Sequence, residues 1–446
     1  MVGTDLPARP VPEEQPVPDD TFLHVHPHRG WLNDPNGMGL WGGRWHVMYQ
    51  WNPDATTHGN IHWGHASSSD LVHWRDEGAA LAPRAGTVDA GGAWSGVAVV
   101  DDGVPTLVYT AVRDGAHDSG VVIAPGRSGP HGDTFTQATT SVAPHPQGWI
   151  DVRDPFLLTV EGRRYAVQGA GRPTGGGAVL VYAVPEVSAS WELLGELAAA
   201  ADLPGGVPTR GDVWECPQLV RLGETWVLIV SWLEDEGARQ GVTAYTGDLE
   251  VTDGVPRFVA GGGAPLDHGP DFYAPQALVA DDRVLVSGWS WESRADGVDG
   301  ISLDEIAARG WAGLLTIPRE LVLEDGVARL VPCREVVALS GAALDVTRHG
   351  DGDVLTTPSP TWLAHASGPV ELHLVSADAS RTVWSGDVGT AATVLVDGTI
   401  VEIFAADGSH TLRVYPRDGE AWVLHARHPG AGLEARALAP AWSTRP

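Results

Sequence analysis

The chain reads Asn33-Asp34-Pro35-Asn36, then a Gly42-Gly43 turn, then the run Arg44-Trp45-His46-Val47-Met48-Tyr49. Glycine tolerates the reversal of a tight turn, and a short run of apolar and aromatic residues is typical of a strand. Four more strand-like runs follow tight turns in the same way: Thr106-Leu107-Val108-Tyr109-Thr110, Arg164-Tyr165-Ala166-Val167-Gln168, Thr225-Trp226-Val227-Leu228-Ile229-Val230 and Arg283-Val284-Leu285-Val286-Ser287. The order of polar cluster, turn and strand is therefore an internal repeat.

A polar or aromatic cluster precedes each of these runs. One residue from each cluster serves as a marker: Asp34, Ser95, Asp154, Glu215 and Tyr273. Successive markers are 61, 59, 61 and 58 residues apart, and this period, with several strands per repeat, predicts a β-propeller of five blades. Because equivalent positions of radial blades lie on one ring, the clusters are expected to converge on a central pocket. Turn residues capping similar hairpins are the plainer interpretation, but turn chemistry does not account for Trp94, Arg153 or Trp214.

The repeat divides the chain into three parts. Residues 1–20 form an acidic, proline-rich segment, residues 21–330 the five-bladed β-propeller, and residues 331–446 a smaller C-terminal β-sandwich. The second boundary lies where the sixty-residue rhythm stops, and the runs beyond it are shorter and alternate between apolar and polar residues. The predicted fold class is therefore all-β, with the chemistry confined to the propeller.

Two local signals refine this prediction. Ser302-Leu303-Asp304-Glu305 has the Ser-x-x-Glu form of a capping box, and Gly310 can end a helix, so this segment is predicted to be the only helix of the chain. Asp397-Gly398 and Asp407-Gly408 are strong short signals for hairpins. They place two tight turns in the C-terminal sandwich.

Composition and charge exclude several classes of protein. The chain has 28 basic residues, all of them arginine, against 57 acidic ones, which gives a net charge of −29. Such a field repels nucleic acid phosphates and anionic membrane surfaces, and no apolar run is long enough to span a bilayer. The N-terminus lacks the features of a signal peptide, and Cys216 and Cys333 offer at most one disulfide. We therefore expect a cytoplasmic enzyme without nucleic acid or membrane partners, whose oligomeric state the sequence leaves open.

Three acids belong to the ring of clusters: Asp34, Asp154 and Glu215. Two carboxylates that flank a bond can hydrolyse a glycoside, since one protonates the leaving oxygen while the other attacks or activates water. Turn amides and an Asn side chain are expected to keep Asp34 ionised as the nucleophile. Glu215 lies between Trp214 and Cys216, a low-polarity setting that favours a proton donor. Arg153 is not expected to pair with Asp154 unless the strand bends, because consecutive strand residues point to opposite faces.

Aromatic residues surround these clusters. The chain has 19 Trp against 7 Tyr and 6 Phe. Flat apolar rings stack on the C–H faces of sugars, although large aromatic residues also serve as core; Trp31 and Trp63 are interpreted as sugar-binding. His24, His26 and His28 alternate and could ligate a metal, but without an acidic partner close in the sequence they are interpreted as surface histidines.

Three segments carry a resemblance to a known family. Trp31-Leu32-Asn33-Asp34-Pro35-Asn36-Gly37, Arg153-Asp154-Pro155 and Glu215-Cys216 resemble the signatures of the family 32 glycoside hydrolases, which include invertases, fructan β-fructosidases and sucrose-6-phosphate hydrolases. The resemblance continues through further segments along nearly the whole chain: Tyr49-Gln50-Trp51-Asn52-Pro53, Trp63-Gly64-His65-Ala66, Asp70-Leu71-Val72-His73-Trp74, Trp94-Ser95-Gly96, Asp271-Phe272-Tyr273-Ala274, Pro318-Arg319-Glu320-Leu321 and Val401-Glu402-Ile403-Phe404.

The resemblance implies a five-bladed propeller followed by a β-sandwich, and a retaining mechanism that needs no cofactor or metal. Asp34 is expected to attack C2 of a terminal β-fructofuranosyl unit while Glu215 protonates the leaving oxygen and then activates water, with the two carboxyls roughly 5–5.5 Å apart. The aspartate that matches Asp154 is expected to bind fructose hydroxyls and stabilise the transition state. The positions expected to bind substrate are Asn33, Gln50, Trp63, Trp94, Ser95, Arg153, Tyr273 and His58.

The substrate class is predicted to be sucrose or short fructo-oligosaccharides. His58 departs from the family pattern, which usually has tryptophan there, on the leaving-group side; Trp51 and Trp94 also depart from it. Three alternatives remain open: transfer of the fructosyl unit to another sugar, fructan binding without catalysis, and cleavage of arabinosides by a neighbouring propeller family. Sucrose 6-phosphate is a further substrate if arginines gather at the pocket mouth.

Overall fold

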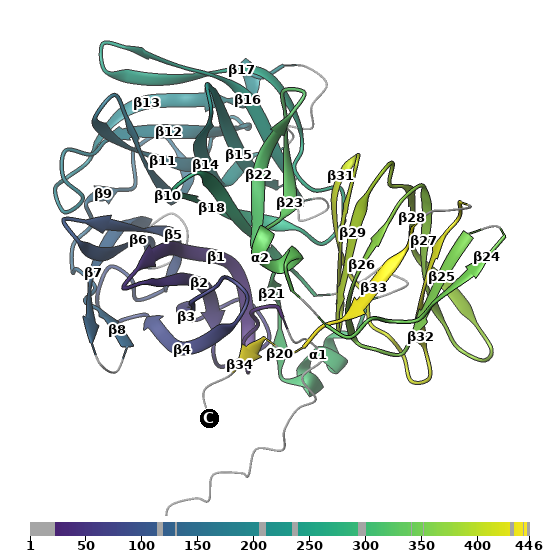
Figure 1. Ribbon diagram of the computed structural model, residues 1–446. Helices are drawn as coiled ribbons and strands as arrows, with labels where there is room; N and C mark the ends of the chain where they lie inside the picture. The colour runs from purple at the N-terminus through teal and green to yellow at the C-terminus, as the bar shows by residue number, and fades with distance from the viewer. Residues whose placement is uncertain are drawn as a thin grey trace, which may run out of the picture.

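The computed structural model describes residues 23–113, 119–129, 132–204, 211–233, 240–292, 300–339, 341–350, 352–428, 432–439 and 441–443. The predicted N-terminal segment, residues 1–20, lies outside the described residues. Strands dominate the rest, in a ring of sheets that runs from purple to green in Figure 1 and a smaller two-sheet body, yellow-green, beside it.

Four-stranded antiparallel groups follow one another along the ring. The first two groups are β1 (Gly30–Trp41), β2 (Arg44–Asn52), β3 (His62–Ser68), β4 (Trp74–Leu81) and β5 (Gly92–Asp101), β6 (Val104–Val112), β7 (Ser119–Gly129), β8 (Gly132–Phe135), with β9 (Ala143–Pro144) beside β7. The next two are β10 (Ile150–Val160), β11 (Arg163–Gly171), β12 (Gly177–Ala183), β13 (Glu192–Ala199) and β14 (Val213–Leu222), β15 (Thr225–Leu233), β16 (Gln240–Thr252), β17 (Val255–Pro265). The last is β18 (Tyr273–Ala280), β19 (Arg283–Ser290), β22 (Arg319–Glu324), β23 (Val327–Pro332), with the short β21 (Leu314–Leu315) beside β19. The short β20 (Trp311–Ala312) pairs with β1 of the first group.

The first strand of each group lies at the centre of the ring. β1, β5, β10, β14 and β18 contact one another in that order, and β18 also contacts β1, so the ring closes. Closure in this way leaves few exposed sheet edges, which is how a propeller manages the edge-strand problem. The all-β class and the propeller are thus confirmed, and the count of five blades stays a prediction that this ring supports.

The C-terminal body is a β-sandwich of two five-stranded sheets. One sheet has the order β24 (Val346–His349), β25 (Gly352–Thr357), β32 (Ala421–Ala426), β27 (Pro369–Val375), β28 (Ser380–Asp387), and the other β31 (Gly408–Arg413), β30 (Ile400–Ala405), β29 (Ala392–Asp397), β26 (Thr361–Ala366), β33 (Glu434–Ala437). Trp362 and Trp422, one from each sheet, meet edge to face in the core between them. The two predicted Asp-Gly turns join β29 to β30 and β30 to β31.

Two strands bear on the predicted domain boundary between residues 330 and 331. β23 ends at Pro332, and β34 (Trp442–Ser443) returns to pair with β4 of the first strand group (Figure 1). The division into domains therefore remains a proposal, with the last strand shared by the propeller.

The predicted helix is α1 (Leu303–Arg309). Ser302 and Glu305 form the capping box, and Gly310 ends the helix in the left-handed conformation, at φ 84°. The prediction of a single helix was wrong, because the structure also contains α2 (Arg334–Val337) and a 3₁₀ turn, Ala200–Asp202. Both are too short to give a periodic pattern in the sequence. Among the described residues, neither helix is long and apolar enough to cross a membrane.

Buried charges join the ring to the sandwich. Arg319 of β22 is fully buried and forms ion pairs with Asp267 and with Glu402 of β30, at 2.8 Å each. His24 is buried too, and its ring nitrogens lie 2.7 Å from Asp397 and 2.9 Å from the same Glu402. Two of the segments that carry the family resemblance, around Arg319 and Glu402, thus meet across the interface.

The interpretation of His24 and His26 as surface histidines was wrong. His24 has acidic partners more than 370 residues away, which no local pattern could show. His26 is buried and stacks on Trp311, with ring centroids 4.5 Å apart. Only tertiary packing brings these groups together.

The ion-paired His24 is expected to make stability fall as the pH rises. Burial alone lowers the pKa of His24, but the hydrogen bonds and charges of Asp397 and Glu402 outweigh burial and raise the pKa to about 9. The folded protein therefore holds this proton more tightly than the unfolded chain. The resulting stabilisation is complete below pH 6.5 and is lost as the pH rises through about 9.

We expect the free energy of unfolding, measured by urea denaturation, to decrease by on the order of 3 kcal/mol over this range. The His24→Gln variant should lose most of this pH dependence. An unchanged slope in that variant would contradict the assignment of the buried proton to His24.

Candidate active site

An irregularity recurs at the same place in each central strand. The pairing register shifts within Asn33–Pro35, Trp94–Gly96, Arg153–Phe156, Glu215–Gln218 and Tyr273–Gln276. Bulges of this kind bend a strand and re-aim its side chains. Asp154 and Cys216 also have positive φ, 60° and 45°. The five marker residues therefore leave the regular strand alternation where the strands meet at the centre of the ring.

Asp34 lies buried at this centre. Its Oδ2 accepts hydrogen bonds from Ser95 Oγ at 2.6 Å and Gln50 Nε2 at 3.0 Å, and its Oδ1 accepts one from Asn33 Nδ2 at 3.1 Å. Burial raises the pKa of Asp34, the charge of Glu215 acts in the same direction, and the bonds from Ser95 and Asn33 oppose it. Burial therefore acts against the expected ionised form of Asp34, and the hydrogen bonds from Ser95 and Asn33 act for it, so the ionised nucleophile stays a prediction.

Asp154 is the second buried acid. Its Oδ2 accepts a hydrogen bond from the backbone N–H of Cys216 at 2.8 Å. Burial raises the pKa of Asp154 to about 7, the charges of Glu215 and Asp34 add to this, and the charge of Arg153 opposes it. Burial and the neighbouring acids therefore favour the neutral form of Asp154.

Glu215 has polar neighbours, which corrects the expected low-polarity setting. Its Oε1 accepts from Arg153 Nε at 3.1 Å and from Nη2 at 2.9 Å, and its Oε2 accepts from the Tyr273 hydroxyl at 2.5 Å. As expected, Arg153 does not direct these bonds to its neighbour Asp154. Trp214, the flanking residue that suggested an apolar setting, is fully buried in the core. Glu215 is thus fixed by two donors, with its side chain 16% exposed.

The hydroxyl of Tyr273 is expected to contribute to catalysis by fixing Glu215. A hydrogen bond to a charged group contributes about 1.5–3 kcal/mol, which corresponds to a factor of roughly 10 to 150. We expect Tyr273→Phe to lower kcat/KM on sucrose by about that factor without changing the melting temperature much. The measurement is initial-rate kinetics; kinetics equal to those of the unmodified protein would show that the hydroxyl does not matter.

Aromatic residues form the rim above the acids. Trp94 is half-buried, lies 5.9 Å from the Arg153 guanidinium and meets the exposed His58 edge to face. Loss of solvent around the ring lowers the pKa of His58, whereas the charges of Asp34 and Glu215 raise it. His58 therefore lies close enough to Asp34 and Glu215 for their charges to act on it. This is the position where the sequence departs from the family pattern.

Trp63 is the predicted site residue that the structure contradicts. Its side chain is fully buried and packs edge to face on Tyr109 in the core of the first two strand groups. A ring with no exposed surface cannot stack on a sugar. Trp63 acts on the site indirectly, because its indole N–H donates to the Trp94 carbonyl at 3.2 Å. Trp31, by contrast, is half-buried and meets Trp289 at 5.5 Å.

Two residues of the site had no predicted role. Thr110 Oγ1 accepts from the Asp154 N–H at 2.8 Å and donates to the Ser95 carbonyl at 3.1 Å. The thiol of Cys216 lies 3.6 Å from Asp34 Oδ2 and 3.5 Å from Asp154 Oδ2. The sequence offered a signal for each residue. Thr110 is the polar residue that ends the apolar run 106–110, and Cys216 directly follows the predicted acid Glu215.

The axis below the acids is filled. Asn36 Oδ1 accepts from the Gly96 N–H at 3.0 Å, and Gln276 bridges the Met38 N–H and the Gly96 carbonyl at 2.6 Å each. A cavity of about 10 Å³ remains there, close to the smallest that holds one water. The acids thus rest on a polar plug that joins β1, β5 and β18.

A model of the glycosyl hydrolases family 32 N-terminal domain matches residues 24–332 of this chain. The chain belongs to glycosyl hydrolase family 32. This family 32 chain is 33% identical over 432 residues to a sucrose-6-phosphate hydrolase of Klebsiella pneumoniae, with 88% of each chain covered. It is 33% identical over 328 residues to a raffinose invertase of Escherichia coli, which covers 71% of this chain and 65% of that protein.

Solved structures of family 32 share the fold. A mutant β-fructofuranosidase of Bombyx mori in complex with sucrose has a TM-score of 0.79 and 24% identity, over 95% of this chain and 94% of that one. A sucrose-6-phosphate hydrolase of Lactobacillus gasseri has a TM-score of 0.75 and 24% identity, over 92% and 93%. The predicted family is therefore confirmed, and the protein is a glycoside hydrolase.

Proposed function

We propose that this enzyme releases terminal, non-reducing β-D-fructofuranosyl units from sucrose or short fructo-oligosaccharides. The names of its relatives, sucrose-6-phosphate hydrolase and raffinose invertase, support this substrate class. The observation that carries the proposal is the central cluster, in which Asp34 and Glu215 lie close enough for the charge of one to raise the pKa of the other. Cytoplasmic location remains a prediction.

The proposed reaction proceeds in two steps with retention at C2. In the first step an Asp34 oxygen attacks C2, the bond from C2 to the leaving oxygen breaks, and that oxygen takes the proton of Glu215. In the second step water attacks C2 and gives a proton to Glu215 while the bond to Asp34 breaks. Fructose leaves, and both carboxyls return to their first state.

The surroundings of the acids support these roles. Asp34 is held by Ser95, Gln50 and Asn33, which fix the attacking oxygen. Glu215 is held by Arg153 and Tyr273, which fix the carboxyl group that is proposed to protonate the leaving oxygen. Asp154, whose Oδ2 faces the Cys216 amide and thiol, is proposed to bind fructose hydroxyls and stabilise positive charge at C2.

A substrate panel with resolved sugar products tests the proposal. The panel consists of sucrose, sucrose 6-phosphate, raffinose, kestose, inulin, levan and an aryl arabinofuranoside. We expect release of fructose from sucrose and the short oligosaccharides. New trisaccharides at high sucrose concentration would indicate transfer, activity on the arabinoside alone would indicate the neighbouring family, and no product from any substrate would indicate a binding protein.

A further inference from the structure

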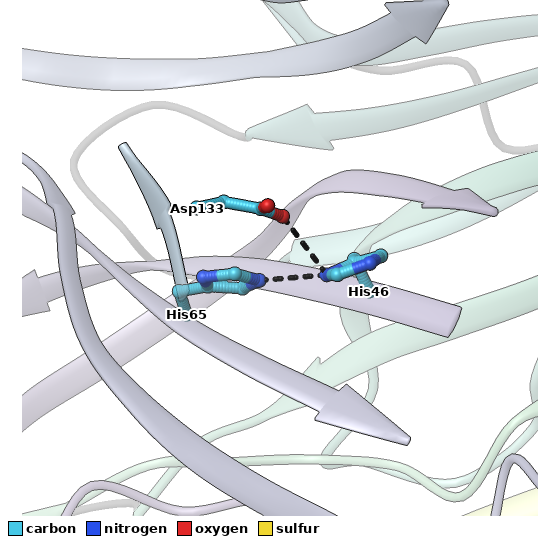
Figure 2. Close-up of side chains that lie close together, drawn as sticks. All are labelled: His46, His65 and Asp133. Carbon is cyan, nitrogen blue, oxygen red and sulfur yellow. Dashed lines mark hydrogen bonds and ion pairs between the residues drawn. The ribbon is translucent and has the colours of Figure 1, made fainter. Parts of the chain in front are cut away.

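Two histidines and an aspartate, none of them among the catalytic acids, lie close together (Figure 2). His46 comes from β2, His65 from β3 and Asp133 from β8, so the group joins the first strand group to the second. The Nδ1 of His46 is 2.9 Å from the Nε2 of His65 and 3.9 Å from the Oδ2 of Asp133. One potential ligand atom from each residue lies within 4.8 Å of the others. In the described part of the chain, no other such group of three is found.

Trp41 orients two members of this group. The Nε2 of His46 lies 3.2 Å from the Trp41 carbonyl, an acceptor only, so Nε2 carries the hydrogen and Nδ1 presents a lone pair to His65 and Asp133. The Trp41 indole stacks flat on the His46 ring at 3.8 Å, and its N–H donates to Asp133 Oδ2 at 2.6 Å. A histidine whose second nitrogen donates to a carbonyl is the arrangement that typically fixes metal ligands.

Two of the three distances between donor atoms lie near the spacing that a zinc ion requires, and all three are within 4.8 Å. Zinc binds nitrogen at about 2.0–2.1 Å and carboxylate oxygen at about 2.0–2.2 Å in tetrahedral geometry, so its ligand atoms lie roughly 3.3–3.5 Å apart. The observed 2.9 Å and 3.9 Å stand on either side of this value. Shifts of about half an ångström would bring His46 and Asp133 to their places around an ion.

Burial and charge also suit a cation. His46 and His65 are 6% and 3% exposed, and the side chain of Asp133 is 10% exposed. Metal ions bind histidine through the lone pair of its neutral ring. Glu77 lies near both rings but pairs with Arg75 at 2.5 Å, so Asp133 supplies the negative charge of the site.

We propose that His46, His65 and Asp133 form a zinc site that ties the first strand group of the propeller to the second. The alternative is a histidine pair that is simply hydrogen-bonded. The site is separate from the catalytic acids, because Gln50, which contacts Asp34, lies four residues beyond His46, roughly 13 Å along β2. Water would fill the fourth tetrahedral position, the ion is expected to act on stability, and hydrolysis is expected to continue without it.

Zinc binding to the untagged, chelator-treated full chain tests this proposal. We expect one equivalent of Zn²⁺ to bind, and the melting temperature to rise by several degrees with zinc. Co²⁺ in the same site should give the intense visible absorption of tetrahedral coordination. The variants His65→Gln and Asp133→Asn should each weaken zinc binding at least 100-fold by loss of a ligand.

Matched variants control for general effects. His73→Gln removes an exposed histidine of the same strand group and should leave zinc binding and the melting shift unchanged. Circular dichroism without metal shows whether each variant is folded. Absence of stoichiometric binding and of the Co²⁺ spectrum in the unmodified chain would overturn the proposal even if a variant failed to fold. Equal affinity in folded His65→Gln, Asp133→Asn and unmodified protein would overturn it as well.

Discussion

Replacing Asp34 with asparagine is expected to lower kcat on sucrose by about 10⁴-fold or more. The amide has nearly the same shape as the carboxylate but cannot form the covalent bond to C2, and loss of a nucleophile typically costs this much. The substitution also removes a buried charge that lies beside other acids. The melting temperature should therefore stay the same or rise, because burial and the charge of Glu215 already disfavour the ionised form. Initial-rate kinetics and thermal unfolding measure the two effects.

A matched aspartate outside the site provides the control. Asp102 is exposed and has a φ of 48°, a conformation that asparagine tolerates well. Asp102→Asn should leave kcat within about twofold. If Asp34→Asn turned over sucrose at a comparable rate, the nucleophile would have to be another group.

Replacing Glu215 with glutamine is expected to have the second largest effect. General acid catalysis contributes about 10²–10⁴-fold, and glutamine cannot give a proton to the leaving sugar. We expect kcat on sucrose to fall by about 10³–10⁴-fold. The loss in kcat/KM should be much smaller for an aryl β-fructofuranoside than for sucrose, because kcat/KM reports the first step and an aryl oxide leaves without protonation. The ratio of the two losses, measured by initial rates, identifies the acid.

The stability of the Glu215→Gln variant serves as its control. Arg153 could keep its contact to the amide oxygen, and the Tyr273 hydroxyl could accept from the amide NH2, so the fold should persist by circular dichroism. Equal losses on sucrose and on the aryl fructoside would mean that Glu215 acts by charge or position and not as a proton donor.

The fold could be predicted because the pattern that produces each strand group is repeated in the sequence. Each strand group repeats a polar cluster, a tight turn and an apolar run, so the period of about 60 residues places Asp34, Asp154 and Glu215 at equivalent positions. α1 was predicted from its own capping box, which is a local signal. These features depend on neighbours in the chain, and a sequence displays such neighbours directly.

The parts that were missed depend on contacts between distant residues or on irregular backbone. The bulge after Arg153 aims its guanidinium at Glu215, 62 residues away, and regular strand alternation does not predict this pairing. His24 is buried because two acids of the sandwich reach it. Trp63 was predicted to stack on a sugar and lies in a segment that resembles the family, yet its side chain is buried in the hydrophobic core. Burial of this kind follows from tertiary packing.

Trapping of the covalent intermediate tests the proposed chemistry without relying on rates alone. The Glu215→Gln variant is incubated with an aryl β-fructofuranoside, quenched in acid and digested, and the peptides are examined by mass spectrometry. The first step should proceed while the second lacks its base, so the peptide that contains Asp34 should carry the mass of one fructosyl residue, and Asp34→Asn should abolish the label. A fructosyl label on another residue would contradict attack by Asp34. So would release of the aryl group with no labelled peptide, if the methyl fructoside formed in added methanol had the inverted configuration at C2.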